Sequence, residues 1–146
     1  MKIAVNRCYG GFGLSVAAFK RLIEMNSPLV RKITYSEYTG GRASSFFNQE
    51  DDWQAKDWHD VGDGLFAGHG EYVLYDETGE TVWTHDARSY ENRTHPDLLA
   101  VIKELGEDVA SGEHAEIEIV DIPDGIEYEI EDYDGIETVE EAHRSW

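Results

Sequence analysis

A glycine-rich segment near the start of the chain contains residue types that can bind anions. Residues 8–15 read Cys-Tyr-Gly-Gly-Phe-Gly-Leu-Ser, and Ser15 suits the N-cap of a following helix. Backbone N–H groups at a helix N-terminus bind phosphate and carboxylate groups. The glycines match neither the dinucleotide-binding pattern G-x-G-x-x-G nor a Walker loop. The alternative is a tight turn in which the glycines supply positive φ, and both interpretations stay open.

A second candidate for anion binding precedes a later predicted helix. Residues 88–95 form the basic cluster of the acidic part of the chain, and Arg93 lies just before Pro96. The Arg93 guanidinium and the free N–H groups of this helix end suit a phosphate or carboxylate, with Tyr90 or Trp83 stacking on a base. The alternative is that Asp97 satisfies the helix end and Arg93 pairs with a nearby carboxylate.

Patterns typical of catalysis or metal binding are few. Cys8 has no His or Asp near it in the sequence to lower the pKa of its thiol. The six His residues follow no metal-binding spacing, and the Asp residues at 57, 60 and 63 do not form a calcium loop. We predict no catalytic residue, metal or cofactor, and keep a small hydrolase using Cys8 or a His–Asp pair as an alternative.

Two predicted strands carry glutamate at alternate positions. Residues 115–122 and 126–132 alternate acidic and apolar side chains, which is typical of strands with one wet face. The turn signal at residues 123–125 links them, so we predict a C-terminal acidic β-hairpin with a two-column carboxylate surface. Three interpretations of this surface stay open. It is simply a solvated face, its charge is compensated by Lys2 and Arg7 on the first strand, or it imitates the phosphate backbone of a nucleic acid. Its predicted residues are Glu116, Glu118, Glu127, Glu129 and Glu131.

Charge is unevenly distributed along the chain. The formal net charge is −19, with +4 in residues 1–50 and −23 in residues 51–146. Between Lys103 and Arg144 there are 16 acidic residues and no basic one. Such a field repels nucleic acid and anionic membranes and attracts basic protein surfaces. General adaptation to high salt is the alternative, although it does not explain a positive first third.

Hydrophobic periodicity predicts the elements that position these residues. Helices are expected after Ser15, ending before Pro28, and from Pro96, with Thr94 or His95 as the cap. Residues 29–38 fit a helix or a strand. Strands are expected at 2–7, 71–76, 81–86, 115–122, 126–132 and near 137–140. The fold class predicted is α+β, an antiparallel sheet with two main helices packed on one face.

The length and composition limit the class of protein. A chain of 146 residues is expected to form one domain, 1–146, with residues 39–70 as an irregular insertion containing short helices, or a lid. We find no apolar run of about 18 residues and no signal peptide, so no membrane contact and a cytoplasmic location are expected. A lone Cys8 excludes a disulfide-stapled scaffold.

Several motifs resemble those of a group of small phage- and prophage-encoded proteins. These motifs are MKIAVNRCYGGFGLS at residues 1–15, Arg-Thr-His-Pro at 93–96, Glu-Leu-Gly at 104–106 and His-Arg-Ser-Trp at 143–146. The resemblance covers about 60 residues and leaves out residues 27–90. It implies a viral origin, a place in the host cytoplasm and a role in countering host defence, but no particular chemistry. It also implies that residues 8–15, Arg93 and residues 143–146 meet in one site.

The leading prediction is a non-enzymatic binding protein with one cationic pocket for a small phosphorylated or nucleotide-like ligand. The alternative is an inhibitor that imitates nucleic acid and binds a basic host protein through its acidic hairpin, without binding nucleic acid itself. The predicted ligand-binding residues are Arg7, Tyr9, Gly10, Gly11, Phe12, Ser15, Asn92, Arg93, Thr94, His143, Arg144 and Trp146.

Overall fold

The computed structural model describes residues 1–34, 59–67, 73–78 and 80–141. The chain divides into two compact units. Unit 1 comprises Met1–Leu29 and Asp86–Trp146, and unit 2 comprises Val30–His85. Helices and antiparallel sheets both occur, so the predicted α+β class is confirmed.

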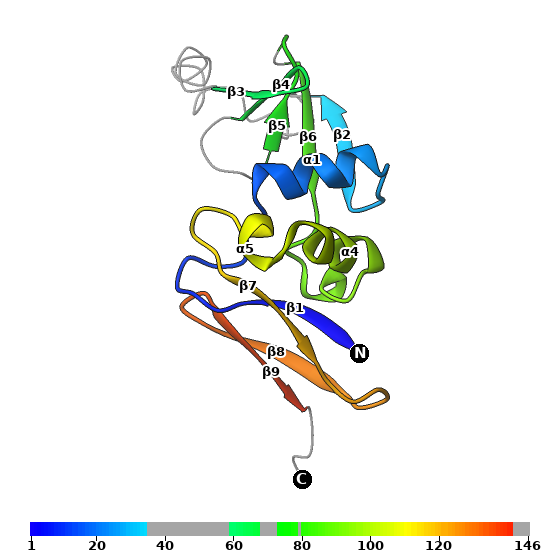
Figure 1. Ribbon diagram of the computed structural model, residues 1–146, viewed down its shortest axis with the longest axis vertical. Coiled ribbons are helices and arrows are strands. Elements are labelled where there is room, and N and C mark those ends of the chain that lie inside the picture. The colour runs from blue at the N-terminus through cyan, green and yellow to red at the C-terminus, as the bar shows by residue number, and fades with distance from the viewer. Residues whose placement is uncertain (35–58, 68–72, 79, 142–146) are drawn as a thin grey trace. The chain divides into compact units, whose positions relative to one another are not determined.

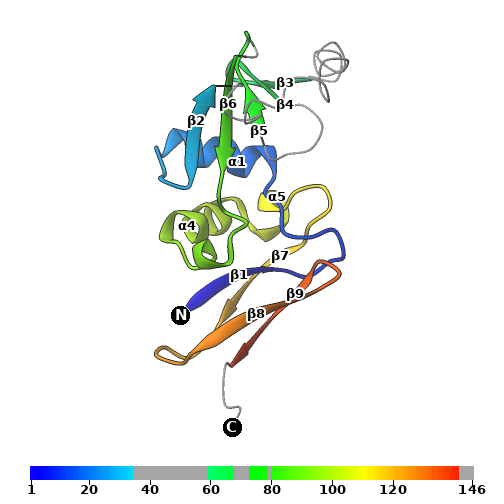
Figure 2. The same ribbon diagram turned by 180° about the vertical axis from the view of Figure 1, so that it is seen from behind.

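Unit 2 is an antiparallel sheet. Its strands lie in the order β2-β6-β5-β4-β3 (Figure 2). Their bounds are β2 (Val30–Thr34), β3 (His59–Gly62), β4 (Leu65–Ala67), β5 (Val73–Tyr75) and β6 (Thr81–His85). The strands predicted at residues 71–76 and 81–86 correspond to β5 and β6, which pair with each other as an antiparallel hairpin. Val73, Tyr75 and Val82 form a buried cluster, against which Ile33 and Phe66 pack.

The irregular insertion predicted at residues 39–70 lies mostly outside the described residues. Its described part, residues 59–67, contains the paired strands β3 and β4 rather than short helices. The ambiguity at residues 29–38 resolves as a strand, since β2 pairs with β6 over its whole length.

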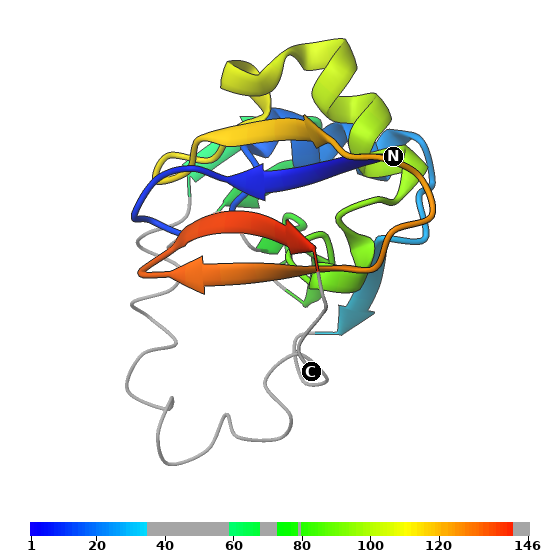
Figure 3. The same ribbon diagram turned by 90° about the horizontal axis from the view of Figure 1, so that it is seen from below.

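The strands of unit 1 form two antiparallel pairs. β1 (Lys2–Asn6) pairs with β7 (Ile117–Asp121), and β8 (Tyr128–Tyr133) pairs with β9 (Ile136–Glu141). Figure 3 shows them side by side in the order β7, β1, β9, β8. The predicted pairing of residues 115–122 with 126–132 is wrong.

Local turn chemistry and burial explain this pairing. Asp134 and Gly135, the two residues between β8 and β9, have φ of 55° and 95°. Positive φ at both central residues is typical of a type I′ hairpin turn, for which Asp-Gly is a preferred sequence. β8 therefore pairs with the strand that follows it. β7 pairs instead with β1, in which Ile3, Ala4, Val5 and Asn6 are fully buried.

Local signals for the helices are confirmed. α1 (Val16–Glu24) begins after Ser15, whose Oγ accepts a hydrogen bond from the Ala18 N–H at 3.1 Å. α4 (Pro96–Leu105) begins after His95, whose Nδ1 accepts from the Asp97 N–H at 3.1 Å. The short helices are η1 (Tyr90–Asn92), a 3₁₀ turn, and α5 (Glu107–Ala110).

The helices of unit 1 lie on one side of its strands (Figure 1). α1 buries Ala18, Phe19 and Leu22, and α4 buries Leu98, Val101 and Ile102, each at helical spacing. The described residues include no helix with the length and apolar character needed to cross a membrane.

Candidate functional site

β1 pairs with β7 along one edge, and its other edge needs different partners because buried backbone groups are almost always hydrogen-bonded. The Ala4 N–H donates to the Arg93 carbonyl at 2.9 Å, and the Ala4 carbonyl accepts from Arg93 Nη1 at 3.2 Å. The Asn6 N–H donates to Glu137 Oε1 at 2.8 Å. Arg93 and Glu137 therefore provide along this edge the hydrogen bonds that a neighbouring strand would make.

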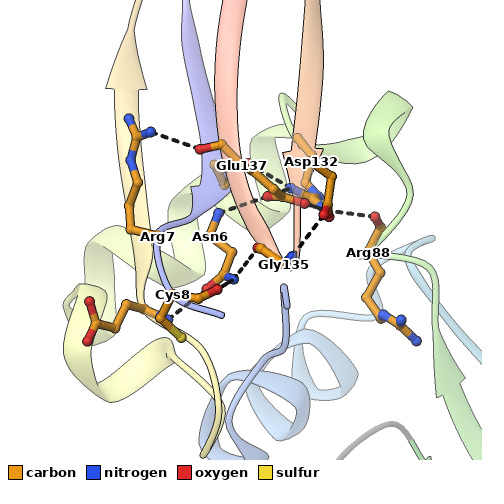
Figure 4. A network of polar contacts seen from close by, with 10 residues as sticks. Asn6, Arg7, Cys8, Arg88, Asp132, Gly135 and Glu137 are labelled. Carbon is orange, nitrogen blue, oxygen red and sulfur yellow. Dashed lines mark hydrogen bonds and ion pairs between the residues drawn. The ribbon is translucent and has the colours of Figure 1, made fainter. Parts of the chain in front are cut away.

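Arg93 and Glu137 form a buried bidentate ion pair (Figure 4). Arg93 Nη1 lies 2.5 Å from Glu137 Oε1, and Nη2 lies 2.8 Å from Oε2. Both side chains are 2% exposed, and Nη2 also donates to the Arg88 carbonyl at 2.9 Å. Burying two charges is costly unless they are paired and further hydrogen-bonded. The pair meets that condition except at Arg93 Nε, which is buried and has no hydrogen-bond partner among the described residues.

Two aromatic rings lie against the Arg93 guanidinium. Its Cζ is 3.8 Å from the centre of the Phe12 ring and 5.3 Å from the centre of the Tyr90 ring. Arginine favours this arrangement because its planar cation is attracted to the face of an aromatic ring. Phe12 is buried, whereas Tyr90 is 46% exposed.

Arg7 and Asn6, at the end of β1, also contact β9 and its turn. Arg7 donates from Nη1 to the Glu137 carbonyl at 2.8 Å and from Nε to Glu118 at 3.0 Å. Asn6 Nδ2 donates to the Gly135 carbonyl at 2.6 Å. Glu137 thus has contacts with both arginines, through its carboxylate and its carbonyl.

The glycine-rich segment is closely packed. A side chain at Gly10 would clash with His114, and one at Gly135 would lie 2.7 Å from the Gly11 nitrogen. These contacts and the positive φ of Gly11 (88°) support the tight-turn interpretation of residues 8–15. Cys8 lies beside the same turn, where its Sγ donates to the His114 carbonyl at 3.0 Å.

A hollow of ≈ 370 Å³ lies next to the ion pair. It is lined by Gly11, Phe12, Arg88, Ser89, Tyr90, Arg93, Asp132 and Glu137. Burial raises the pKa of Tyr90, the carboxylates of Asp132 and Glu137 raise it further, and Arg93 opposes them. The carboxylates therefore outweigh Arg93 in their effect on the Tyr90 hydroxyl.

The structure brings together only some of the predicted ligand-binding residues. Gly11, Phe12 and Arg93 line the hollow. Three others have contacts of their own: Ser15 caps α1, Gly10 packs on His114, and Asn92 donates to the Asp86 carbonyl. Tyr9 is 69% exposed, and neither Tyr9 nor Thr94 lines the hollow. His143, Arg144 and Trp146 lie outside the described residues.

The predicted anion clamp at Arg93 has an occupant within the chain. Glu137 takes both terminal nitrogens of the guanidinium, which is the alternative that the sequence left open. At the start of α4, Asp97 accepts from Ser27 Oγ at 2.7 Å and lies in the first turn, where it offsets the helix dipole. Arg93 and the N-terminus of α4 are therefore each matched by a carboxylate of the chain.

Glu137 and Asp132, the two carboxylates of this site, are not among the site residues predicted from the sequence. Residues 136–141 read Ile-Glu-Thr-Val-Glu-Glu, so neither face of β9 is uniformly apolar and alternation does not show which face is buried. The one usable signal is the absence of any base between Lys103 and Arg144, because a buried acid in this stretch must then find its cation elsewhere in the chain.

The predicted acidic residues lie in two different sheets. Glu118, on β7, is compensated by Arg7. On β8, Glu129 lies directly opposite Glu140 of β9, and Glu131 lies opposite Thr138. Glu127, Glu129, Glu131 and Glu140 are exposed and form no ion pair within the described part of the chain. We call Glu129, Glu131 and Glu140 the outer acidic face.

Among the residues that the structure describes, no group of three or more His, Cys, Asp or Glu side chains is arranged to hold a metal ion. Comparison of the chain with protein-family models, curated proteins and solved structures gave no match.

Proposed function

We propose that this chain is a non-enzymatic binding protein that docks its outer acidic face on a basic protein surface. The observation that carries the proposal is the cross-strand pair Glu129–Glu140, which is exposed and uncompensated among the described residues. Like charges directly opposite each other destabilise a sheet by roughly 0.2–1 kcal/mol. A binding partner that brings positive charge relieves this repulsion, because charges across an interface are arranged to complement each other.

The attachment of the hairpin supports the same proposal. Glu137 fixes the inner side of β9 to Arg93 and β1 through buried hydrogen bonds. A face held in this way loses little conformational freedom on binding, and preorganisation of this kind favours affinity. The outer acidic face is therefore presented on a rigid element.

The partner class that fits best is a nucleic-acid-binding protein. Such proteins use Lys and Arg to neutralise phosphates, and a net charge of −19 gives this chain an opposite field. We further propose, on the resemblance to small phage proteins, that the partner belongs to a host cell and that the chain counters host defence by binding it. In this proposal the chain competes with nucleic acid rather than binding it.

The test is a binding assay against a panel of purified basic nucleic-acid-binding proteins at about 50 and 200 mM salt, where screening differs strongly. We expect binding to at least one protein of the panel, weakening as salt rises and competed by duplex DNA. The triple variant Glu129→Gln, Glu131→Gln and Glu140→Gln should lower that affinity about tenfold or more.

A matched control separates the position of the charges from their number. Glu24→Gln, Glu77→Gln and Glu80→Gln together remove the same number of exposed carboxylates elsewhere in the chain. This control should keep most of the affinity. Equal losses in the two triple variants, or no binding to the panel at low salt, would reject the outer acidic face as the docking surface.

A second candidate function is the binding of a small phosphorylated or nucleotide-like ligand in the hollow. It is favoured by the buried Arg93 Nε, which no described residue hydrogen-bonds, and by the two aromatic rings. It is the less supported candidate, since an anion there meets Asp132 and must compete with Glu137 for Arg93. Isothermal titration against a nucleotide panel tests it, and the absence of heat with every compound rejects it.

A further inference from the structure

The hollow beside the ion pair lies at the turn end of the β8–β9 hairpin. Asp132 reaches it from β8 and Glu137 from β9, whereas Ser89 and Tyr90 reach it from the segment before α4. Its volume of ≈ 370 Å³ is at the small end of the range for pockets that hold small molecules, about 300–1,000 Å³. It is therefore large enough for a single side chain of a partner.

The charged residues that line this hollow are two arginines, Arg88 and Arg93, and two carboxylates, Asp132 and Glu137. Arg93 is matched by Glu137, so the pair adds no net charge. Asp132 is exposed, accepts a hydrogen bond from the Gly135 N–H at 2.9 Å and forms no ion pair with a described residue. Arg88 also lines the hollow, but its guanidinium points away from the Asp132 carboxylate (Figure 4), which leaves that carboxylate available to a cation entering the hollow. The hollow therefore favours a cation over an anion.

Its aromatic wall favours a planar cation. The Tyr90 ring is partly exposed, and Arg93 already stacks against Phe12 in the same place. Guanidinium groups stack on aromatic faces and bind carboxylates in a fixed fork, whereas an ammonium is a strongly hydrated point charge. The ring of Tyr90 and the carboxylate of Asp132 together offer both contacts.

We infer that the hollow binds the guanidinium of an arginine side chain from the basic partner, stacked on Tyr90 and paired with Asp132. This inference rests on the proposed docking of the outer acidic face. It adds a second contact with the same partner at the turn end of the β8–β9 hairpin. Arginine and tyrosine are enriched among residues that carry most of the energy of an interface. The hollow thus supplies a specific anchor beside a surface that otherwise attracts any basic protein.

The test needs no partner protein. N-acetyl-argininamide is titrated into the ¹⁵N-labelled full chain, and the backbone amide shifts of Gly11, Ser89, Tyr90 and Gly135 are followed. We expect saturable shifts at these amides with argininamide. The matched probe N-acetyl-citrullinamide, which has a neutral urea in place of the guanidinium, and adenosine monophosphate should leave them unchanged. Shifts that are equal with citrullinamide, shifts with the nucleotide, or no shifts with argininamide would each overturn the inference.

Variants locate the site. Asp132→Asn keeps an oxygen acceptor for the Gly135 N–H but removes the charge, and Tyr90→Leu removes the aromatic ring. Each should weaken argininamide binding about 2–5-fold, as expected for loss of a contact worth roughly 0.5–1 kcal/mol. Asp134→Asn is the control, because it removes an exposed charge from the same turn but does not line the hollow. An equal loss in Asp134→Asn would mean that general charge, and not this hollow, attracts the probe.

The two proposals fail separately. The triple variant of the outer acidic face leaves Tyr90 and Asp132 in place, so it should still bind argininamide. If argininamide binds as expected but no basic protein of the panel does, the docking proposal falls and the guanidinium site stands. If a basic protein binds through the outer acidic face and argininamide does not shift the hollow, only the guanidinium site falls.

Discussion

Arg93 and Glu137 form a buried ion pair beside β1 in unit 1. Together they provide hydrogen bonds to Ala4 and Asn6 on the edge of β1 that does not pair with β7, and they connect β1 to β9. Removing one partner leaves the other as a buried, uncompensated charge, which is more destabilising than removing both. The pair is therefore expected to hold the hairpin in place.

Glu137→Gln tests this role. The substitution keeps the shape of the side chain but removes its charge, so it should lower the opening free energy of β1 and β9 by about 3–5 kcal/mol. Amide hydrogen exchange at Val5, Asn6 and Ile130 measures the effect within unit 1. The double variant Arg93→Met with Glu137→Leu should lose less than the sum of the two single changes. Additive losses would show that the two charges do not depend on each other.

Tyr90 reports the negative field of the hollow. Burial and the carboxylates of Asp132 and Glu137 raise its pKa above the ordinary value of 10.0. At pH values between 10.0 and the folded pKa, the unfolded chain has lost a proton that the folded chain retains, so stability falls as the pH rises through this window. Below it, Tyr90 makes no contribution to the pH dependence.

Asp132→Asn should lower the pKa of Tyr90, measured by the NMR titration of a ¹³C label at its Cζ. Asp134→Asn, whose carboxylate is not among the groups that shift Tyr90, should change the pKa less. Tyr90→Phe should remove part of the stability loss at alkaline pH. A Tyr90 pKa at or below 10.0 would contradict a hollow dominated by carboxylates.

At the scale of elements, the β8–β9 hairpin is attached through its turn. Gly135 packs on the backbone of Tyr9 and Gly11, and Asn6 accepts the Glu116 N–H and donates to the Gly135 carbonyl. The turn of the hairpin and the glycine-rich segment thus meet backbone to backbone. Such a close approach is possible only where one side has no Cβ.

Two glycine substitutions separate this contact from backbone strain. Gly125 and Gly135 both follow an Asp and have positive φ, 84° and 95°, but only Gly135 has atoms close to where a Cβ would stand. Gly125→Ala should destabilise the chain by about 1–2 kcal/mol through strain alone. Gly135→Ala should cost clearly more and increase hydrogen exchange in β8 and β9. Equal effects would show that the turn moves away freely from the glycine-rich segment.

At the scale of the whole molecule, the acidic charge opposes folding. The chain carries −19 formal charges, and the outer acidic face places Glu129 and Glu140 opposite each other. Net charge far from zero destabilises the compact state through self-repulsion. Because the Glu129–Glu140 pair lowers stability, it supports the proposed role of this face in binding, as expected where function and stability conflict.

Glu140→Thr should therefore stabilise the hairpin while weakening the docking to a basic partner. Thr fits a strand well and removes the repulsion with Glu129, so a gain of about 0.2–1 kcal/mol is expected, larger at low salt than at high salt. Thermal unfolding at about 20 and 500 mM salt measures it. Glu77→Thr, an exposed acid in a turn of unit 2, is the control and should show no comparable gain. A gain that does not depend on salt would contradict repulsion as its cause.

The sequence by itself determined the elements and their ends. Ser15, His95 and Pro96 start the two main helices, and Asp134-Gly135 defines a two-residue turn, because these signals act on backbone groups a few residues away. Alternation placed the strands near their observed positions. The glycine-rich segment and the basic cluster at residues 88–95 pointed to Gly11, Phe12 and Arg93, three of the residues that line the hollow.

Only the tertiary structure decided which strands pair and what charge the hollow has. β7 pairs with β1 rather than with β8, and Arg93 pairs with Glu137, 44 residues further along the chain. These choices depend on satisfying the buried edge of β1, where a carboxylate and a guanidinium provide hydrogen bonds that no local pattern encodes. The basic residues alone predict an anion pocket. Because Glu137 neutralises Arg93 and Asp132 lines the same hollow, we propose instead that the hollow binds a cation.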